Sequence, residues 1–191
     1  MPTILINNAG IVMGGNLLDL SIEQVEKSIA VNLLAHFYTI KIFLPAMIRA
    51  GRGTIVTVAS VIGITGAAQL TDYAAAKAGL IAMHTSLSAE LRSEHPEIKM
   101  VLITPGQLST PLFEGVKTPS RFFAPIVEPI EVAKEIIATV DKGESDILAM
   151  PLYARWAGWL NVMPVGVQRV ARWMSGVDVG MKTFKKETKK E

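Results

Sequence analysis

The chain has 191 residues, enough for one domain of ordinary size and small for two. Half of the residues are apolar and 19% are charged, so the composition suits a large buried core and excludes a disordered or fibrous chain. The absence of cysteine excludes disulfides, thiolate zinc sites, iron–sulfur clusters and a cysteine nucleophile. Because His36, His84 and His95 are scattered, we expect no metal site.

The net charge of +2 is concentrated at the C-terminus. Residues 182–191 carry five Lys and two Glu, a local charge of +3, which leaves the other 181 residues at −1. This balance argues against a nucleic-acid-binding surface. The tail is either a solvated terminus or an electrostatic contact with a membrane surface. No apolar run reaches about 18 residues and the N-terminus does not resemble a signal peptide, so we expect neither a membrane span nor secretion.

The chain opens with a strand followed by a long helix. Residues 3–6 form a short apolar run that Asn-Asn-Ala-Gly ends, which is typical of a buried strand. Apolar residues then recur at helical spacing from Ser21 to about Ala50. Ser21 is the expected N-cap, with Gln24 three residues later, and Gly51 is the expected stop.

Strands and helices continue to alternate as far as residue 149. We expect further strands at 54–59, 99–103 and 146–149, helices from Thr71 or Asp72 to Ser93 and at about 130–142, and a loop over 105–129. Each strand is a continuous apolar run, which indicates a parallel sheet with helices on both faces, an α/β fold. Ligands of such sheets bind at the C-terminal ends of the strands, where residues 7–10, Ser60 and 105–110 fall.

Tyr73 and Lys77 carry the strongest chemical signal. They lie four residues apart on an expected helix, so their side chains share a face. A phenol is a poor acid–base catalyst near neutral pH unless a cation stabilises the phenolate, and an ammonium one turn away supplies that charge. Ser60 ends the preceding strand, where its hydroxyl can bind a substrate oxygen, and Asn32 can complete a proton path through water and Lys77.

Several short motifs occur together in a fixed order. The order and spacing of these motifs resemble those of the short-chain dehydrogenase/reductase family, and the resemblance covers roughly residues 3–150. The resemblance implies a Rossmann-type sheet that binds NAD or NADP and supports hydride transfer between the nicotinamide and a carbonyl or alcohol carbon. The matching positions are Asn7-Asn8-Ala9-Gly10, Asn32, Ser60, Tyr73, Lys77, Pro105-Gly106 and Thr110.

The resemblance also implies a role for each matched residue. Tyr73 is the general acid–base, Lys77 lowers its pKa and holds the nicotinamide ribose, Ser60 orients the substrate oxygen, and Asn32 supports the proton relay. Asn32, Tyr73 and Lys77 also count among the expected cofactor-binding residues. The rest of that set is Asn8, Ala9 and Gly10 on the adenosine side, and Pro105, Gly106, Leu108 and Thr110 near the nicotinamide carboxamide.

The first strands of the family fold are missing from this sequence. Family members begin with a strand, a glycine-rich phosphate turn and a second strand whose end discriminates NAD from NADP. This sequence opens at what resembles the fourth strand, and no long helix follows Gly14-Gly15. We therefore expect an N-terminally truncated domain without the phosphate half-site, whose first strand is exposed. The choice between NAD and NADP is left open.

The C-terminal segment carries all three Trp together with Arg155, Arg169 and Arg172. It is either a substrate lid or dimer-packing segment, or an interfacial helix pair that lies on a membrane. Met150-Pro151-Leu152 and the ending around Met181 and Phe184 resemble the retinol and hydroxysteroid dehydrogenase branch, which favours the membrane alternative. We expect a location on endoplasmic reticulum or lipid-droplet surfaces, with a cytoplasmic protein as the alternative.

The resemblance and the apolar tail lead to one main functional hypothesis. We expect a catalytic domain over residues 1–150 and an amphipathic segment over 151–191. The expected activity is oxidoreduction of an apolar alcohol or ketone, such as a retinoid, steroid or other lipid. The alternative is a non-catalytic short form that acts only in binding or dimerisation. We also expect a homodimer through the helices at 21–50 and 72–93.

Overall fold

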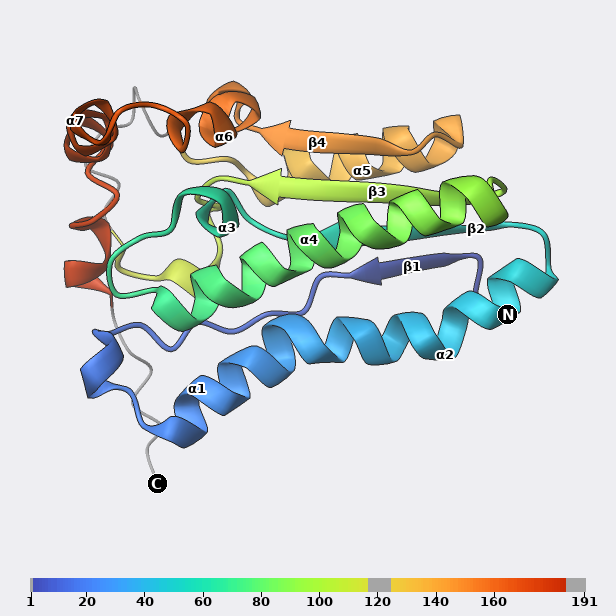
Figure 1. Ribbon diagram of the computed structural model, residues 1–191, viewed down its shortest axis with the longest axis horizontal. Helices are drawn as coiled ribbons and strands as arrows, with labels where there is room; N and C mark the ends of the chain where they lie inside the picture. The colour runs from blue at the N-terminus through green and yellow to red at the C-terminus, as the bar shows by residue number, and fades with distance from the viewer. Residues whose placement is uncertain (1, 117–124, 185–191) are drawn as a thin grey trace.

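The computed structural model describes residues 2–116 and 125–184. Four parallel strands form one sheet in the order β1-β2-β3-β4, and the arrows of β1, β3 and β4 in Figure 1 point the same way. The expected parallel α/β sheet is confirmed. β3 extends two residues beyond the expected strand because Thr104 and Pro105 pair with Ala149 and Met150. The strands are β1 (Ile4–Asn7), β2 (Gly53–Val58), β3 (Ile98–Pro105) and β4 (Asp146–Met150).

Three long helical segments connect and cover the strands. The first is continuous through a π-helical turn and comprises α1 (Ile22–Ile29), the turn Ala30–Leu34 and α2 (Ala35–Arg49). The other two are α4 (Thr71–Glu94) and α5 (Pro129–Lys142). Shorter helices are α3 (Ile62–Thr65), α6 (Ala157–Leu160) and α7 (Val165–Ser175), and 3-10 turns lie at Leu17–Asp19, Pro111–Phe113, Leu152–Trp156 and Gly180–Thr183.

The expected start of the first helix is confirmed by a capping box. The Ser21 hydroxyl accepts a hydrogen bond from the Gln24 N–H at 3.2 Å, and the Gln24 side chain accepts one from the Ser21 N–H at 3.0 Å. At the other end Gly51 has a φ of +63°, which glycine adopts without steric cost. Local sequence therefore sets both ends of this helix.

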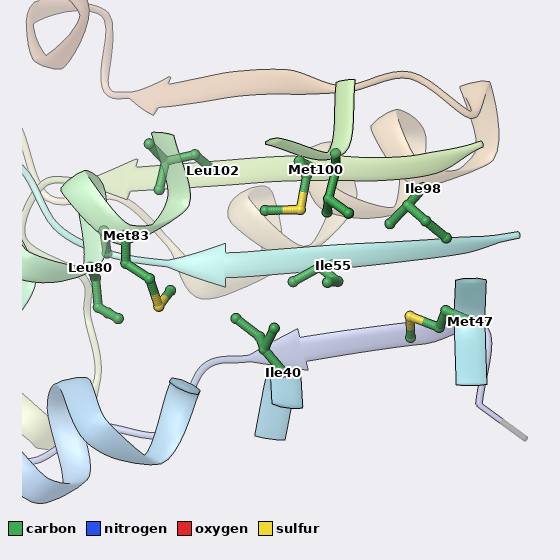
Figure 2. Packing of buried hydrophobic residues seen from close by; sticks show 10 residues of the cluster. Ile40, Met47, Ile55, Leu80, Met83, Ile98, Met100 and Leu102 are labelled. Atoms are coloured by element: carbon green, nitrogen blue, oxygen red, sulfur yellow. The ribbon is translucent and has the colours of Figure 1, made fainter. Parts of the chain in front are cut away.

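The two faces of the sheet carry different helices. α1, α2 and α4 lie on one face, whereas α5 covers β3 and β4 on the other (Figure 1). Figure 2 shows the larger apolar cluster between α2, α4 and the sheet, made mainly by Ile40, Met47, Ile55, Leu80, Met83, Ile98, Met100 and Leu102. The second cluster joins α5 to Val56, Val58, Val101, Ile103 and Leu148.

β1 exposes one of its faces, which agrees with the expected exposure of the first strand, whereas the buried strand that its apolar run indicates is not found. Ile4 and Ile6 are 45% and 51% exposed, whereas Asn7 is buried on the opposite face. Ile6 pairs in register with Val56, so its side chain lies on the α5 face of the sheet, which α5 does not cover at β1. Two β-branched side chains are therefore left in contact with solvent.

The helix over Ile22–Arg49 is long and apolar enough to cross a membrane by length and composition. The sequence pattern did not predict this, since no uninterrupted apolar run has that length. In the fold, Ile40 and Met47 pack against the sheet and Asn32 is fully buried. The buried face of this helix thus belongs to the domain core.

Residues 151–184 pack across the end of the sheet to which the strands point (Figure 1). Ala154 and Ala157 contact Val61, and Met181 packs with Leu70 and Tyr73. The segment therefore completes the core beside the ends of the strands. The division into a domain over 1–150 and a segment over 151–191 stays a prediction.

Candidate active site

Ser60, Tyr73 and Lys77 come together at the C-terminal end of β2. Their exposed fractions are 6%, 4% and 3%. Ser60 lies two residues after the end of β2, and the other two lie in the first turns of α4. The loop after Ser60 approaches α4 closely, because a Cβ added at Gly63 would lie 2.7 Å from the carbonyl carbon of Lys77. Glycine at this position lets the loop and the helix meet.

The Ser60 hydroxyl joins two strands and the helix. It accepts a hydrogen bond from the Ile62 N–H at 3.2 Å and donates one to the Pro105 carbonyl at 3.4 Å. A hydrogen bond between Ser60 and Tyr73 also acts to lower the pKa of the phenol. The serine is therefore placed to share a bound oxygen atom with Tyr73.

Tyr73 is held as a neutral phenol. Burial raises its pKa to about 12, and the hydrogen bond with Ser60 offsets part of that effect. The ring of Phe113 packs edge-on at a centroid distance of 5.9 Å. The Lys77 ammonium lies 5.7 Å from the Tyr73 ring centroid. That Lys77 lowers the pKa of the phenol stays a prediction.

Lys77 is one of the most deeply buried polar side chains of the site. Its Nζ donates a hydrogen bond to the Val58 carbonyl at 2.8 Å, and burial lowers its pKa to about 8. A Cβ added at Gly10 would lie 3.8 Å from this Nζ and 3.0 Å from the Asn32 Oδ1. Lys77, Asn32 and the backbone at Gly10 therefore border one small region.

Asn32 lies in the π-helical turn, and its side chain hydrogen-bonds the backbone of the loop that follows β1. Its Oδ1 accepts a hydrogen bond from the Ile11 N–H, and its Nδ2 donates to the Ile11 carbonyl, both at 2.9 Å. Nδ2 also donates to the Ser28 hydroxyl at 3.2 Å. Both amide hydrogens are thus engaged, so the side chain fixes this loop, and the relay role of Asn32 stays a prediction.

The segment after β1 divides into a buried and an accessible part. Asn7 is buried, and its Oδ1 accepts a hydrogen bond from the Thr39 hydroxyl at 2.8 Å. Asn8 and Ala9 are exposed, and Gly10 is half-buried. Asn8, Ala9 and Gly10, the residues of this segment that are expected to contact a cofactor, are therefore accessible, whereas Asn7 secures the strand end to α2.

Gly14-Gly15 serves packing in this fold. A Cβ at Gly14 would lie 2.6 Å from the ring of Phe184, and the Gly15 N–H donates to the Gln69 carbonyl at 3.1 Å. These contacts agree with the interpretation that this pair is not a phosphate-binding turn.

Pro105 and Gly106 are buried beside the site, and Leu108 and Thr110 are half-buried after them. A Cβ at Gly106 would lie 2.7 Å from the Tyr153 hydroxyl. Tyr153 therefore occupies the space that the glycine leaves open. The sequence analysis missed this tyrosine because it lies 47 positions from Gly106 and carries no local signal.

A cavity of about 380 Å³ adjoins Ser60, and its walls are mainly apolar. Phe113 and Leu70, which pack with Tyr73, belong to its lining. The C-terminal segment supplies much of the remaining wall, including Tyr153, Ala157, Leu160, Arg172, Met174 and Met181. This contribution agrees with the lid alternative for that segment.

Two buried histidines lie near the site and were not predicted to belong to it. His84 Nδ1 lies 3.0 Å from the Thr57 hydroxyl, and burial lowers the pKa of His84 to about 4. Burial and the charge of Lys77 lower the pKa of His36. Helical spacing could have placed both histidines near the site. His36 follows Asn32 by four residues and His84 follows Lys77 by seven, so each shares a helix face with a predicted site residue.

The family model for short chain dehydrogenases matches residues 3–120. The uncharacterized oxidoreductase TDA5 of Saccharomyces cerevisiae is 35% identical over 179 residues, which cover 92% of this chain and 54% of the relative. Retinol dehydrogenase 10-B of Danio rerio is 45% identical over 129 residues, or 67% and 38%. The solved 4-hydroxyisoleucine dehydrogenase complexed with NADH has a TM-score of 0.65 at 26% identity, over 78% of this chain and 67% of that one. The chain spans about half the length, or less, of these curated relatives.

We predict that acid destabilises the fold through His84. The unfolded chain binds a proton at this side chain near pH 6.5, whereas the folded chain does so only near pH 4. The unfolding free energy should therefore fall by up to about 2 kcal/mol between pH 7 and pH 5. Urea unfolding of the parent and of His84→Gln measures this difference, which the substitution should remove. An identical pH dependence in the two proteins would show that His84 does not contribute.

Proposed function

Since the chain belongs to the short-chain dehydrogenase family, we propose that it forms the catalytic part of an oxidoreductase that transfers hydride between NAD or NADP and an apolar alcohol or ketone. The observation that carries the proposal is the joint burial of Ser60, Tyr73 and Lys77 at a place where Ser60 lines an apolar cavity. The name of the retinol dehydrogenase relative supports the same class of substrate.

The residues present fit the nicotinamide end of such a cofactor. A Cβ at Gly10 would lie 3.0 Å from Asn32 Oδ1 and 3.8 Å from Lys77 Nζ. Because glycine has no side chain, we propose that a flat ring of the cofactor can approach the backbone at this point. We propose that Lys77 and Tyr73 hold the ribose. Asn8, Ala9 and Gly10 would line the adenosine side, and Pro105, Gly106, Leu108 and Thr110 the carboxamide. When bound, the nicotinamide supplies or accepts the hydride.

In the direction of reduction, Ser60 would donate a hydrogen bond to the substrate carbonyl oxygen. Tyr73 would give its phenolic proton to that oxygen as the hydride reaches the carbon, and the product is an alcohol. The phenolate left behind needs a cation, which Lys77 supplies while it is protonated, below about pH 8. In the direction of oxidation, the phenolate would take the alcohol proton back.

The cavity favours a neutral, apolar substrate. Its wall is mainly aliphatic and aromatic, and the charge of Arg172 is compensated by Asp178. A retinoid, a steroid or another lipid-like alcohol has this chemistry, since one hydroxyl or carbonyl group would reach Ser60 while the rest is surrounded by apolar side chains.

The alternative function is binding or dimerisation without catalysis. It is favoured by the use of Gly14-Gly15 in packing, because the described chain then offers no glycine-rich turn for a pyrophosphate. Cofactor affinity discriminates between the two functions.

We propose a homodimer through α2 and α4. α2 exposes Phe37, Tyr38 and Ile42, the last with 68% of its surface in solvent. α4 exposes small residues at Ala75, Ala78 and Ala82. Bulky side chains of one helix pair can pack over the small stripe of another, which removes apolar area from water.

We also propose peripheral contact with endoplasmic-reticulum or lipid-droplet surfaces through the C-terminal segment. Trp156, Trp159 and Trp173 are 63%, 61% and 82% exposed. Tryptophan is favoured at the headgroup level of a bilayer. The Lys-rich end of the tail lies outside the described residues. The proposed membrane contact is the location that the sequence led us to expect. A cytoplasmic location is the alternative.

Tyr73→Phe tests the catalytic proposal. We expect turnover of an apolar alcohol with NAD or NADP to fall by at least about a hundredfold, because the proton donor is lost. Tyr38→Phe removes an exposed phenol away from the cavity and is the matched control. Because Tyr38 lies on the proposed dimer face, this variant is compared with the parent once both sediment alike, and its rate should then equal that of the parent. Turnover of Tyr73→Phe within about threefold of the parent would contradict the assignment.

Fluorescence titration of the parent with NADH and NADPH separates catalysis from the alternative. Binding at tens of micromolar or better supports the oxidoreductase. If neither nucleotide binds at that level, the non-catalytic alternative is favoured instead.

Ile42→Glu tests the dimer. We expect the parent to sediment as a dimer at micromolar concentration and the variant as a monomer, because a buried unpaired charge is costly. Ile137→Glu on the exposed face of α5 is the control and should leave the dimer intact. A monomeric parent that is folded would rule out this assembly.

Flotation with phosphatidylserine-containing vesicles tests the membrane contact. The parent should float, and the double variant Trp159→Ser and Trp173→Ser should float less, because two interfacial anchors are lost. Raised salt should leave much of the parent bound, since apolar contacts are not screened. Equal flotation of the parent and the double variant would contradict a role for these tryptophans.

A further inference from the structure

One ion pair fastens the C-terminal segment to the loop that follows Ser60. Arg172 Nε donates to Asp178 Oδ2 at 2.9 Å, and Nη2 donates to Asp178 Oδ1 at 2.5 Å, so the contact is bidentate. Arg172 Nη1 also donates to the Thr65 carbonyl at 2.7 Å, and Asp178 Oδ1 accepts from the Ala68 N–H at 3.2 Å. Both members of the pair therefore bind the backbone of the loop.

The pair lies at the wall of the cavity. Arg172 and Thr65 both line it, and Ser60 lies on the same wall five residues before Thr65. Beyond Asp178 the chain continues to Met181, which lines the cavity and packs against Tyr73. The position of this wall relative to Ser60 and Tyr73 therefore depends on what holds residues 172–181.

Few other contacts secure α7. None of its residues from Val165 to Ser175 is buried, so its apolar packing on the domain is limited. The side chains of Arg172 and Asp178 are 28% and 41% exposed, so the pair is partly buried, and its bidentate geometry makes it stronger than an open surface pair. Burial acts to raise the pKa of Asp178, but its hydrogen bonds to Arg172 and Ala68 and the charge of Arg172 lower it overall, which keeps the pair charged.

We propose that Arg172 and Asp178 are positioning residues that determine substrate size. By holding the cavity wall at one distance from Ser60, the pair selects long apolar alcohols or ketones that fill the cavity over short ones. This inference rests on the proposed function. It assigns the selection of substrate size to one pair of residues. Arg172 acts by positioning the cavity wall and not on the reacting atoms.

Arg172→Met and Asp178→Asn test the pair in the full chain. In each variant the ratio of kcat/KM for decanol to that for butanol should fall by at least about tenfold, mainly through KM for decanol, because the wall is no longer held. Arg172→Lys keeps the charge without the bidentate contact, so its decanol-to-butanol ratio should lie between those of the parent and Arg172→Met. Arg52→Met, an exposed site at the opposite end of β2, is the control and should retain the parent ratio.

Hydrogen exchange and dye binding give readouts that do not need turnover. Backbone amides of residues 176–184 should exchange at least about tenfold faster in both pair variants than in Arg52→Met. The affinity for the neutral apolar dye Nile red should also fall in both.

Unchanged exchange, or faster exchange with an unchanged selectivity ratio, would overturn the proposal. If the parent turns over no alcohol, the proposed function fails. The role of the pair is then tested by comparing the Nile red affinity of the parent with that of the variants. Equal dye affinity in the parent and Arg172→Met then overturns its role in shaping the cavity.

Discussion

The contact between α4 and the end of β2 is the constraint on which the site depends. Lys77 reaches across to the Val58 carbonyl at 2.8 Å, and Gly63 lets the next loop lie directly on the helix backbone. With the helix held there, Tyr73 has to lie beside Ser60. The same proximity buries all three side chains, and burial shifts the pKa of the phenol up and that of the lysine down.

Burial of so many polar groups is tolerated because most of them find partners. Asn32 engages both backbone groups of Ile11, and His84 pairs with Thr57. A buried polar group without a partner destabilises a fold, so these bonds let the polar site lie next to an apolar core. The core of Figure 2 lies on the same face of the sheet and keeps α2 and α4 in place.

The C-terminal segment is compatible with both interpretations that its sequence left open. Its inner side chains, such as Ala157 and Met181, line the cavity, whereas Trp156, Trp159 and Trp173 face outward. A lid and a membrane-facing surface are therefore compatible, because they use opposite sides of one segment. A surface of this kind would bring the cavity close to the phase in which apolar alcohols are dissolved.

The sequence by itself predicted the four strands, the long helices and the residues of the candidate site. Continuous apolar runs predicted the four parallel strands, Ser21 and Gln24 predicted the helix start, and the order of short motifs indicated the family. These features depend on neighbours within a few residues, so local patterns report them. Only the tertiary structure decided that Tyr153 fills the space at Gly106, that Arg172 binds Thr65, and that burial raises the pKa of Tyr73. Such effects join residues far apart in the chain or depend on how completely water is excluded, and neither leaves a periodic signal in the sequence.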